Sequence, residues 1–191
     1  MAHVLLFHHV QGLTDGVRAF AERLRQGGHR VTLPDLFDGR TFPTIEAGLE
    51  YARQIGDDMI AEAGAAAARD LPEDLVYAGI SMGVAPAMKL AQQRPGASGA
   101  LFFHGIVPLG HFGSRWPPDV PLQIHIARDD PYEDPAEVRA LADAAEAELF
   151  LYDVGAHLFT DSSVEGYDAA ATEKVLERTL AFLQRVRQLH A

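Results

Sequence analysis

Short apolar runs alternate with longer amphipathic stretches along the chain. The apolar runs predict strands at residues 4–8, 29–33, 75–79, 100–104, 122–127 and 148–152. The amphipathic stretches predict helices over residues 15–26, 45–69 and 84–93, one that begins near residue 135, and a last one over residues 167–188. Because strands that alternate with helices build a mostly parallel sheet with helices on both faces, we expect a six-stranded α/β fold.

Composition and charge narrow the class of protein. The 191 residues are most simply one domain, residues 1–191, and a content of 48% hydrophobic and 23% charged residues is ordinary for a globular chain. The 27 acidic and 16 basic side chains give a formal charge of −11. Since an acidic surface repels nucleic acids and anionic membranes, we expect neither as a partner. A neutral or weakly charged small molecule is the expected partner, and the chain is compatible with a monomer or a homodimer.

The first residues do not resemble a targeting segment. The apolar run of residues 3–7 is too short for a signal peptide and lacks a basic leader. No stretch approaches the roughly 20 apolar residues that a membrane span requires. The chain has no cysteine and therefore no disulfide framework. The expected location is the cytoplasm.

The segment Gly79-Ile80-Ser81-Met82-Gly83 carries the first chemical signal. It follows an expected strand and precedes an expected helix. In that context G-x-S-x-G forms a nucleophile elbow, in which the glycines let strand and helix backbones approach while the serine is held exposed. The pattern therefore predicts acyl transfer at Ser81.

An acid and a histidine follow the serine in the order that such hydrolases use. Asp129 and Asp130 come after the expected strand at residues 122–127, and His157 comes after the strand at residues 148–152. Both positions lie past the carboxyl ends of strands, where open α/β sheets bind ligands. His157 would act as the general base, and an aspartate would orient its ring. We favour Asp130 over Asp129 because Pro131 restricts the backbone of Asp130 to extended or turn geometry, while Asp134 fits better as a helix cap.

Over nearly its whole length the chain resembles the dienelactone hydrolase family. The matching segments are the loop around Gly12, Leu33-Pro34-Asp35-Leu36-Phe37, the elbow, the Asp130 segment, Gly155-Ala156-His157-Leu158-Phe159 and the closing helix at residues 178–183. The resemblance implies a minimal α/β-hydrolase fold and a hydrolytic activity that needs no cofactor. Since residues 105–121 offer only 17 positions between two strands, a cap domain will not fit, and we expect a shallow site rimmed by this loop and by residues 37–42.

Departures from the family pattern bear on the substrate. Members that open dienelactones usually carry a cysteine at the elbow, where this chain has Ser81, and an acidic residue after the first strand, where it has His8 and His9. Their substrate-binding arginine is matched by Asp161 or a neighbour. The resemblance therefore supports the fold and hydrolysis, and weakens the namesake substrate.

The predicted oxyanion hole consists of two backbone N–H groups. The N–H of Met82 follows the nucleophile and lies at the start of a helix. The N–H of Val10 is the second donor that the family resemblance implies. Candidate pocket residues are His9, Phe37, His104 and Trp116.

The nine histidines do not indicate a metal site. His8, His9, His104 and His111 fall near expected strand ends, yet the chain has no H-E-x-x-H or comparably close ligand spacing. We expect no metal and no functional role for a further group of histidines: His3, His29, His125 and His190.

The leading hypothesis is a serine hydrolase that acts on small carboxylic esters, lactones or thioesters with Ser81, Asp130 and His157. The alternative is a small-molecule binding or sensing protein whose triad is not competent, which His9 and the substituted arginine motivate. A nucleotide-binding domain is poorly supported, because Gly12 and Gly16 do not make G-x-G-x-x-G.

Overall fold

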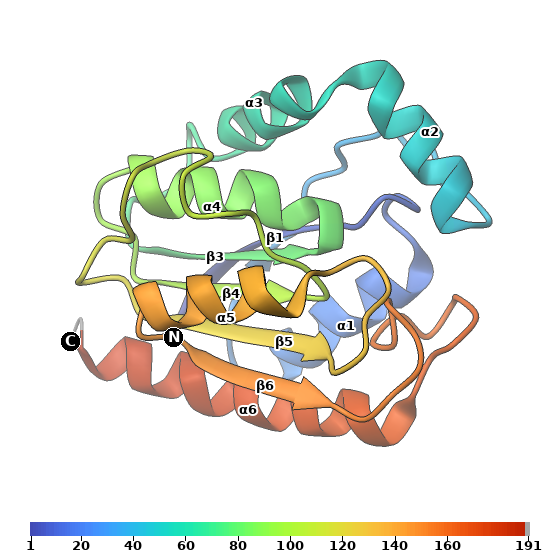
Figure 1. The fold of residues 1–191 in the computed structure, drawn as a ribbon. Helices are drawn as coiled ribbons and strands as arrows, with labels where there is room; N and C mark the ends of the chain where they lie inside the picture. Colours follow the sequence, from blue (N-terminus) through green and yellow to red (C-terminus); the bar gives the residue numbers. More distant parts are fainter. Residues whose placement is uncertain (190–191) are drawn as a thin grey trace.

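The computed structural model describes residues 1–189, so His190 lies outside the described residues. Six strands form one sheet in the order β2-β1-β3-β4-β5-β6, and every neighbouring pair is parallel (Figure 1). The elements follow each other along the chain as β1 (His3–Phe7), α1 (Asp15–Gln26), β2 (Arg30–Thr32), α2 (Ile45–Ile55), α3 (Asp57–Ala67), β3 (Leu75–Ile80), the 3₁₀ turn η1 (Ser81–Gly83), α4 (Val84–Gln93), β4 (Gly99–Phe103), β5 (Leu122–Ala127), α5 (Pro135–Ala144), β6 (Glu148–Tyr152) and α6 (Ala169–Leu189).

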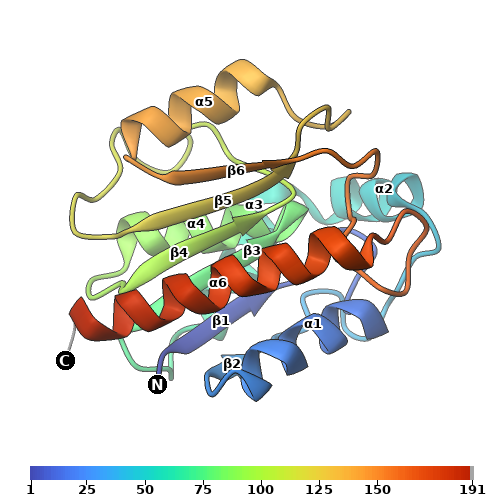
Figure 2. The same ribbon diagram turned by 90° about the horizontal axis from the view of Figure 1, so that it is seen from below.

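Helices cover both faces of the sheet, as expected. Helices α1 and α6 lie on one face, and α4 and α5 lie on the other (Figures 1 and 2). On the first face Phe20 and Phe182 pack against strand residues such as Phe103. On the second face Met88 and Leu141 belong to a separate apolar cluster. The four central strands, β1, β3, β4 and β5, are buried between two cores, which explains why they read as mostly apolar runs in the sequence.

The order of the strands determines where loops can meet. From β1 the chain passes to β2 on one side and then crosses to β3 on the other side. The carboxyl ends of β1 and β3 therefore diverge at a topological switch point, where α/β sheets usually bind ligands. Phe7 at the end of β1 pairs with Gly79 in β3, so the loop after β1 lies next to the elbow.

The structure splits the single helix expected at residues 45–69 into α2 and α3. The break is at Gly56, whose φ of +92° lies in the left-handed region that glycine tolerates. The Gly56 N–H ends α2 by donating to the Ala52 carbonyl, and the Gly56 carbonyl then accepts the N–H of Ile60 in α3. The prediction was wrong because the amphipathic pattern before Gly56 and the alanine-rich sequence after it both favour helix and mask the turn.

Most other boundaries agree with the predictions within one or two residues. The spans of α4, β5 and β6 are confirmed as predicted. The cap predicted at Asp134 is also confirmed, because its Oδ1 accepts the N–H of Ala136 at 2.8 Å. Residues 105–121 contain no helix or strand, and no cap domain is inserted there. Within the described residues, no helix is long and apolar enough to cross a membrane.

Candidate active site

The segment around Ser81 forms a tight turn between β3 and α4. Ser81 has a φ of +52°, a conformation that costs a residue other than glycine strain energy. A Cβ atom at Gly79 would come 2.2 Å from the carbonyl oxygen of Gly83, and one at Gly83 would come 2.4 Å from that of Phe7. Both glycines are thus needed for the close approach of strand, turn and helix, and the turn holds Ser81 past the end of β3.

A chain of hydrogen bonds connects Ser81 to His157 and Asp130. The Ser81 Oγ lies 2.8 Å from the Nε2 of His157, and the Nδ1 of His157 lies 2.8 Å from both carboxylate oxygens of Asp130. Because a carboxylate only accepts, Nδ1 carries the proton and Nε2 is free to accept the proton of the Ser81 hydroxyl. His157 and Asp130 are both buried.

The two adjacent aspartates after β5 have different surroundings. Asp129 is exposed, whereas Asp130 is buried and accepts the N–H of Tyr132 at 3.0 Å in addition to its contact with His157. This arrangement agrees with the choice of Asp130 over Asp129 as the carboxylate that contacts the histidine.

The loop after β1 brings Val10 to the same cavity as Ser81. Two neighbouring N–H groups have partners already, because Gln11 donates to the Nδ1 of His9 at 3.2 Å and Gly12 donates to the His9 carbonyl at 3.0 Å. Val10 and Met82 both line the cavity. Their N–H groups are therefore the candidates for contact with a bound oxygen.

His9 is held by a buried network on the far side of this loop. Its Nε2 donates to the Oδ2 of Asp161 at 2.7 Å, and Thr14 and Ser163 also donate to the Asp161 carboxylate. Burial alone would raise the pKa of Asp161, but the hydrogen bonds from His9, Ser163 and Thr14 outweigh it and lower the pKa to about 2. Asp161 is thus an anion that is fully occupied by donors from the protein, so it does not act as a substitute for a substrate-binding arginine.

A cavity of about 300 Å³ opens beside Ser81. Its polar lining includes Ser81, His157, Tyr132, Glu133 and Asp57. The rest of the wall is mostly aliphatic and comes from the loop after β1, from α2 and α3, from the turn and helix that follow Ser81, and from the loop after β4: Val10, Ile45, Leu49, Ala52, Ile60, Met82, Ala85, Ile106 and Val107. The expectation for the loop after β4 was correct in part, but α2 and α3, rather than residues 37–42, supply the opposite rim.

None of the four candidate pocket residues lines this cavity. His9 is bonded to Asp161, and Phe37 packs in an apolar cluster with Val10 behind the cavity wall. Trp116 is buried against Phe102 and donates from Nε1 to the Val120 carbonyl. These assignments were wrong because position in a loop near the site does not determine whether a side chain turns toward the cavity or into the core.

His104, the fourth candidate, is buried with its ring 6.3 Å from the ring of His157. Its Nε2 lies 2.7 Å from the Oγ1 of Thr160, and its ring packs against Phe159. Burial, followed by the nearby His157, lowers the pKa of His104 well below its usual value. Burial likewise lowers the pKa of His8 to about 4, and its two ring nitrogens bond the His9 carbonyl and the Leu36 N–H. Within residues 1–189 no three histidine, aspartate or glutamate side chains are arranged to hold a metal ion.

Tyr132 and Glu133 are site residues that the sequence analysis missed. The ring of Tyr132 lies 4.7 Å from the ring of His157, and Glu133 shares the cavity with Ser81. Both follow Asp130 within three positions, so the loop after β5 supplies a group of neighbours to the site. That proximity in sequence is the only signal that identifies them, and it does not give the directions of their side chains.

Several solved structures have a similar fold. A dienelactone hydrolase-like promiscuous phosphotriesterase from metagenomic libraries superimposes with a TM-score of 0.70 at 18% identity, covering 97% of this chain and 87% of the other. An α/β-superfamily hydrolase from Xanthomonas campestris gives 0.66 at 24% identity, covering 97% and 99%. A thioesterase domain from the curacin biosynthetic pathway gives 0.63 at 16% identity, covering 92% and 90%.

The sequence matches one protein family over almost its whole length. The model of the dienelactone hydrolase family matches residues 1–187, and the chain belongs to this family of α/β hydrolases. No curated protein shows a significant match in sequence.

Proposed function

We propose that this protein is a serine hydrolase that cleaves small carboxylic esters, lactones or thioesters through an acyl-enzyme. The observation that carries the proposal is the hydrogen-bonded chain from Ser81 Oγ through His157 to Asp130, at a strained turn beside a cavity. Serine is a weak nucleophile unless a neighbouring base accepts its proton, and His157 has its Nε2 placed for that task.

Each step of the reaction uses a group with a defined position. Ser81 Oγ attacks the substrate carbonyl while His157 Nε2 takes its proton, and the N–H groups of Val10 and Met82 stabilise the oxyanion that forms. Collapse of this tetrahedral intermediate breaks the bond to the alcohol or thiol, which leaves with the proton from His157. A water molecule then attacks the acyl-enzyme with His157 again acting as the base. Asp130 holds the imidazole in one tautomer and stabilises its protonated form.

The cavity favours uncharged acyl groups of modest size. Its volume of about 300 Å³ and its mostly aliphatic wall suit an acyl chain of a few carbon atoms. Among residues 1–189, its lining includes no arginine or lysine that could bind a substrate carboxylate, and Asp161 is held in its own network. These features argue for neutral esters, lactones or thioesters over a dienelactone.

The experiment that tests this function measures the mass of the intact protein after treatment with a small fluorophosphonate. We expect a single adduct on the wild type, an adduct on the exposed-serine control Ser114→Ala, and none on Ser81→Ala. Ser81→Ala should also lose turnover of p-nitrophenyl esters. Unchanged turnover in that variant would contradict the proposal.

A binding or sensing protein gives a different result in the same experiment. A folded wild type that forms no adduct, yet gains thermal stability with a small ligand, would favour the alternative in which the triad is not competent. The cytoplasmic location and the monomeric or homodimeric state stay predictions from the sequence.

A further inference from the structure

Glu133 is a carboxylic acid inside the cavity that has no role in the proposed triad. It lies in the loop between β5 and α5, three residues after Asp130, and it lines the cavity with Ser81 and His157. Ester hydrolysis by the triad needs no second carboxyl group. The proposed roles of Ser81, His157 and Asp130 therefore do not explain why Glu133 lies in this cavity.

The contacts of Glu133 place one of its two oxygens close to the nucleophile. Oε2 accepts the N–H of Ile106 at 3.2 Å, which fixes the carboxyl against the loop after β4. A Cβ atom placed on Gly105 would be 3.2 Å from Oε1 of Glu133 and also 3.2 Å from Cα of Ser81. Oε1 and Ser81 are thus both neighbours of Gly105.

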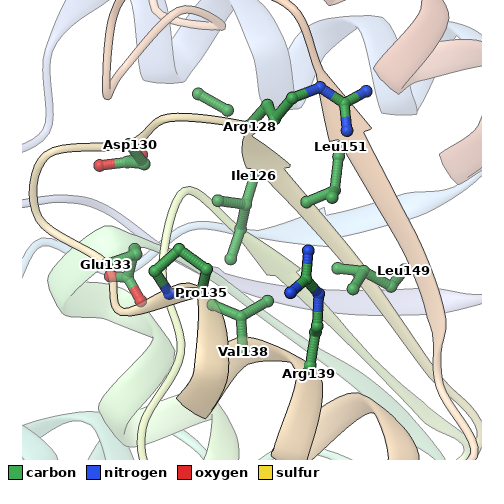
Figure 3. A pocket seen from close by; sticks show the side chains of 10 residues that line it. Ile126, Arg128, Asp130, Glu133, Pro135, Val138, Arg139, Leu149 and Leu151 are labelled. Carbon is green, nitrogen blue, oxygen red and sulfur yellow. The ribbon is translucent and has the colours of Figure 1, made fainter.

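No cation neutralises this carboxyl group within the described residues. Glu133 forms part of the wall between the main cavity and a smaller one of about 40 Å³ between β5, β6 and α5, which Figure 3 shows. Arg128 and Arg139 line that smaller cavity, but Arg128 pairs with Asp153, and neither arginine forms an ion pair with Glu133 in residues 1–189. In Figure 3, Glu133 and Asp130 lie on the same loop at the edge opposite these arginines.

The surroundings keep Glu133 in its acid form near neutral pH. Burial raises its pKa to about 8; the Ile106 N–H opposes this shift, while the charges of Asp130 and Glu137 add to it. The titratable or charged groups around it come from its own loop, α3, α5 and the strands beside it: Asp57, Arg128, Asp130, Tyr132, Glu137, Arg139 and His157. A neutral carboxyl group is a hydrogen-bond donor as well as an acceptor.

We propose that Glu133 is a substrate-recognition residue, whose O–H donates a hydrogen bond to an uncharged oxygen of the acyl group close to the scissile carbonyl. This inference rests on the proposed function and narrows its substrate class. It selects esters, lactones or thioesters whose aliphatic acyl group carries an ether, hydroxyl or oxo oxygen at its second or third position. The aliphatic wall receives the remainder of the chain, and Oε1 supplies a polar contact beside Gly105.

The test compares two p-nitrophenyl esters with acyl groups of equal length, ethoxyacetate and pentanoate, at pH 6.5. The measured quantity is the ratio of their kcat/KM values. The two esters differ in intrinsic reactivity, but this difference is the same for all variants and cancels when their ratios are compared. Relative to Glu133→Leu, the wild type should favour the ethoxyacetate by about 3-fold to 10-fold, the range of one neutral hydrogen bond. Glu133→Gln should keep the preference because its amide N–H₂ also donates, and the exposed Glu177→Gln on α6 serves as the control.

The same ratio should depend on pH in the wild type. Deprotonation removes the donor, so the preference should fall as the pH rises through about 8, and it should stay constant in Glu133→Gln. A wild-type ratio equal to that of Glu133→Leu at pH 6.5, with turnover that still depends on Ser81, overturns the role of Glu133 alone. Turnover that is unchanged in Ser81→Ala overturns the proposed function instead.

A binding measurement keeps the inference testable if the protein does not turn over these esters. In the Ser81→Ala protein, dissociation constants of ethyl ethoxyacetate and ethyl pentanoate from NMR titration give an equivalent ratio. A preference for the ethoxyacetate that disappears in Ser81→Ala/Glu133→Leu supports recognition by Glu133. Equal ratios in the two proteins contradict it.

Discussion

Two buried histidine–carboxylate pairs lie side by side in this protein and differ in what the second ring nitrogen contacts. His157 bonds Asp130 at 2.8 Å, and His9 bonds Asp161 at 2.7 Å. The Nε2 of His157 lies 2.8 Å from the hydroxyl oxygen of Ser81, whose proton can be transferred. The corresponding nitrogen of His9 accepts the backbone N–H of Gln11, which keeps its proton. The same pair thus serves proton transfer in one place and fixes a loop in the other.

The His9–Asp161 pair also connects the segments of the chain that carry His157 and Val10. Asp161 follows His157 by four residues, and His9 immediately precedes Val10. The His9–Asp161 hydrogen bond therefore joins the loop that carries the proposed base to the loop that carries a proposed oxyanion donor. We interpret His9 and Asp161 as positioning residues, because neither side chain lines the cavity.

The largest expected effect is a loss of activity when the Asp130–His157 pair, rather than the Asp161–His9 pair, is changed. Asp130→Asn should lower kcat/KM by about 10⁴-fold, because an amide does not hold His157 in the tautomer that accepts the serine proton. Ester kinetics and a urea unfolding curve measure activity and stability together. The matched control is the exposed neighbour Asp129→Asn, which should retain activity. If Asp129→Asn lost as much activity as Asp130→Asn, the assignment of the acid would be wrong.

Asp161→Asn should instead act mainly on stability. Removing the charge leaves several buried donors poorly matched, and the loss of hydrogen bonds to a charged group typically costs about 1.5 to 3 kcal/mol of unfolding free energy. The turnover number should fall by about 10-fold to 100-fold, because the oxyanion loop is less well positioned. Chemical unfolding and kcat from ester hydrolysis measure the two effects. A 10⁴-fold loss with unchanged stability would show that Asp161 takes a direct part in the reaction.

The smallest expected effect concerns the neighbouring His8, whose Nε2 accepts the Leu36 N–H at 3.0 Å and lies 3.7 Å from the Asp35 carboxylate. Burial lowers its pKa to about 4, so the unfolded chain binds a proton below its pKa of about 6.5 while the folded chain does not. Stability should therefore decrease as the pH falls from about 6.5 to 4, by roughly 2 kcal/mol at pH 5 from this residue. Asp161, with a pKa of about 2, adds a loss only below about pH 4. Urea unfolding at pH 7, 6 and 5 tests this, and His8→Gln should show a smaller slope than the wild type, whereas an equal slope would exclude His8 as the cause.

Local patterns explain which parts of the fold were predictable. Strands buried on both faces give uninterrupted apolar runs, and α4, β5 and β6 were predicted with their observed bounds. The break at Gly56 was missed, since one glycine in an alanine-rich stretch changes the helical periodicity very little. The sequence also indicated the order of Ser81, Asp130 and His157, and the structure brings these three side chains within hydrogen-bond distance.

The sequence by itself determined the class of fold, the family and the candidate nucleophile, base and acid, because these depend on periodicity and on the order of residues past strand ends. Only the tertiary structure decided which side chains share the cavity. Asp161 contacts His9 across 152 positions, and Glu133 meets the Ile106 N–H from another loop. Such contacts depend on side-chain direction and on burial, which change pKa values and hydrogen bonding but leave no periodic signal in the chain.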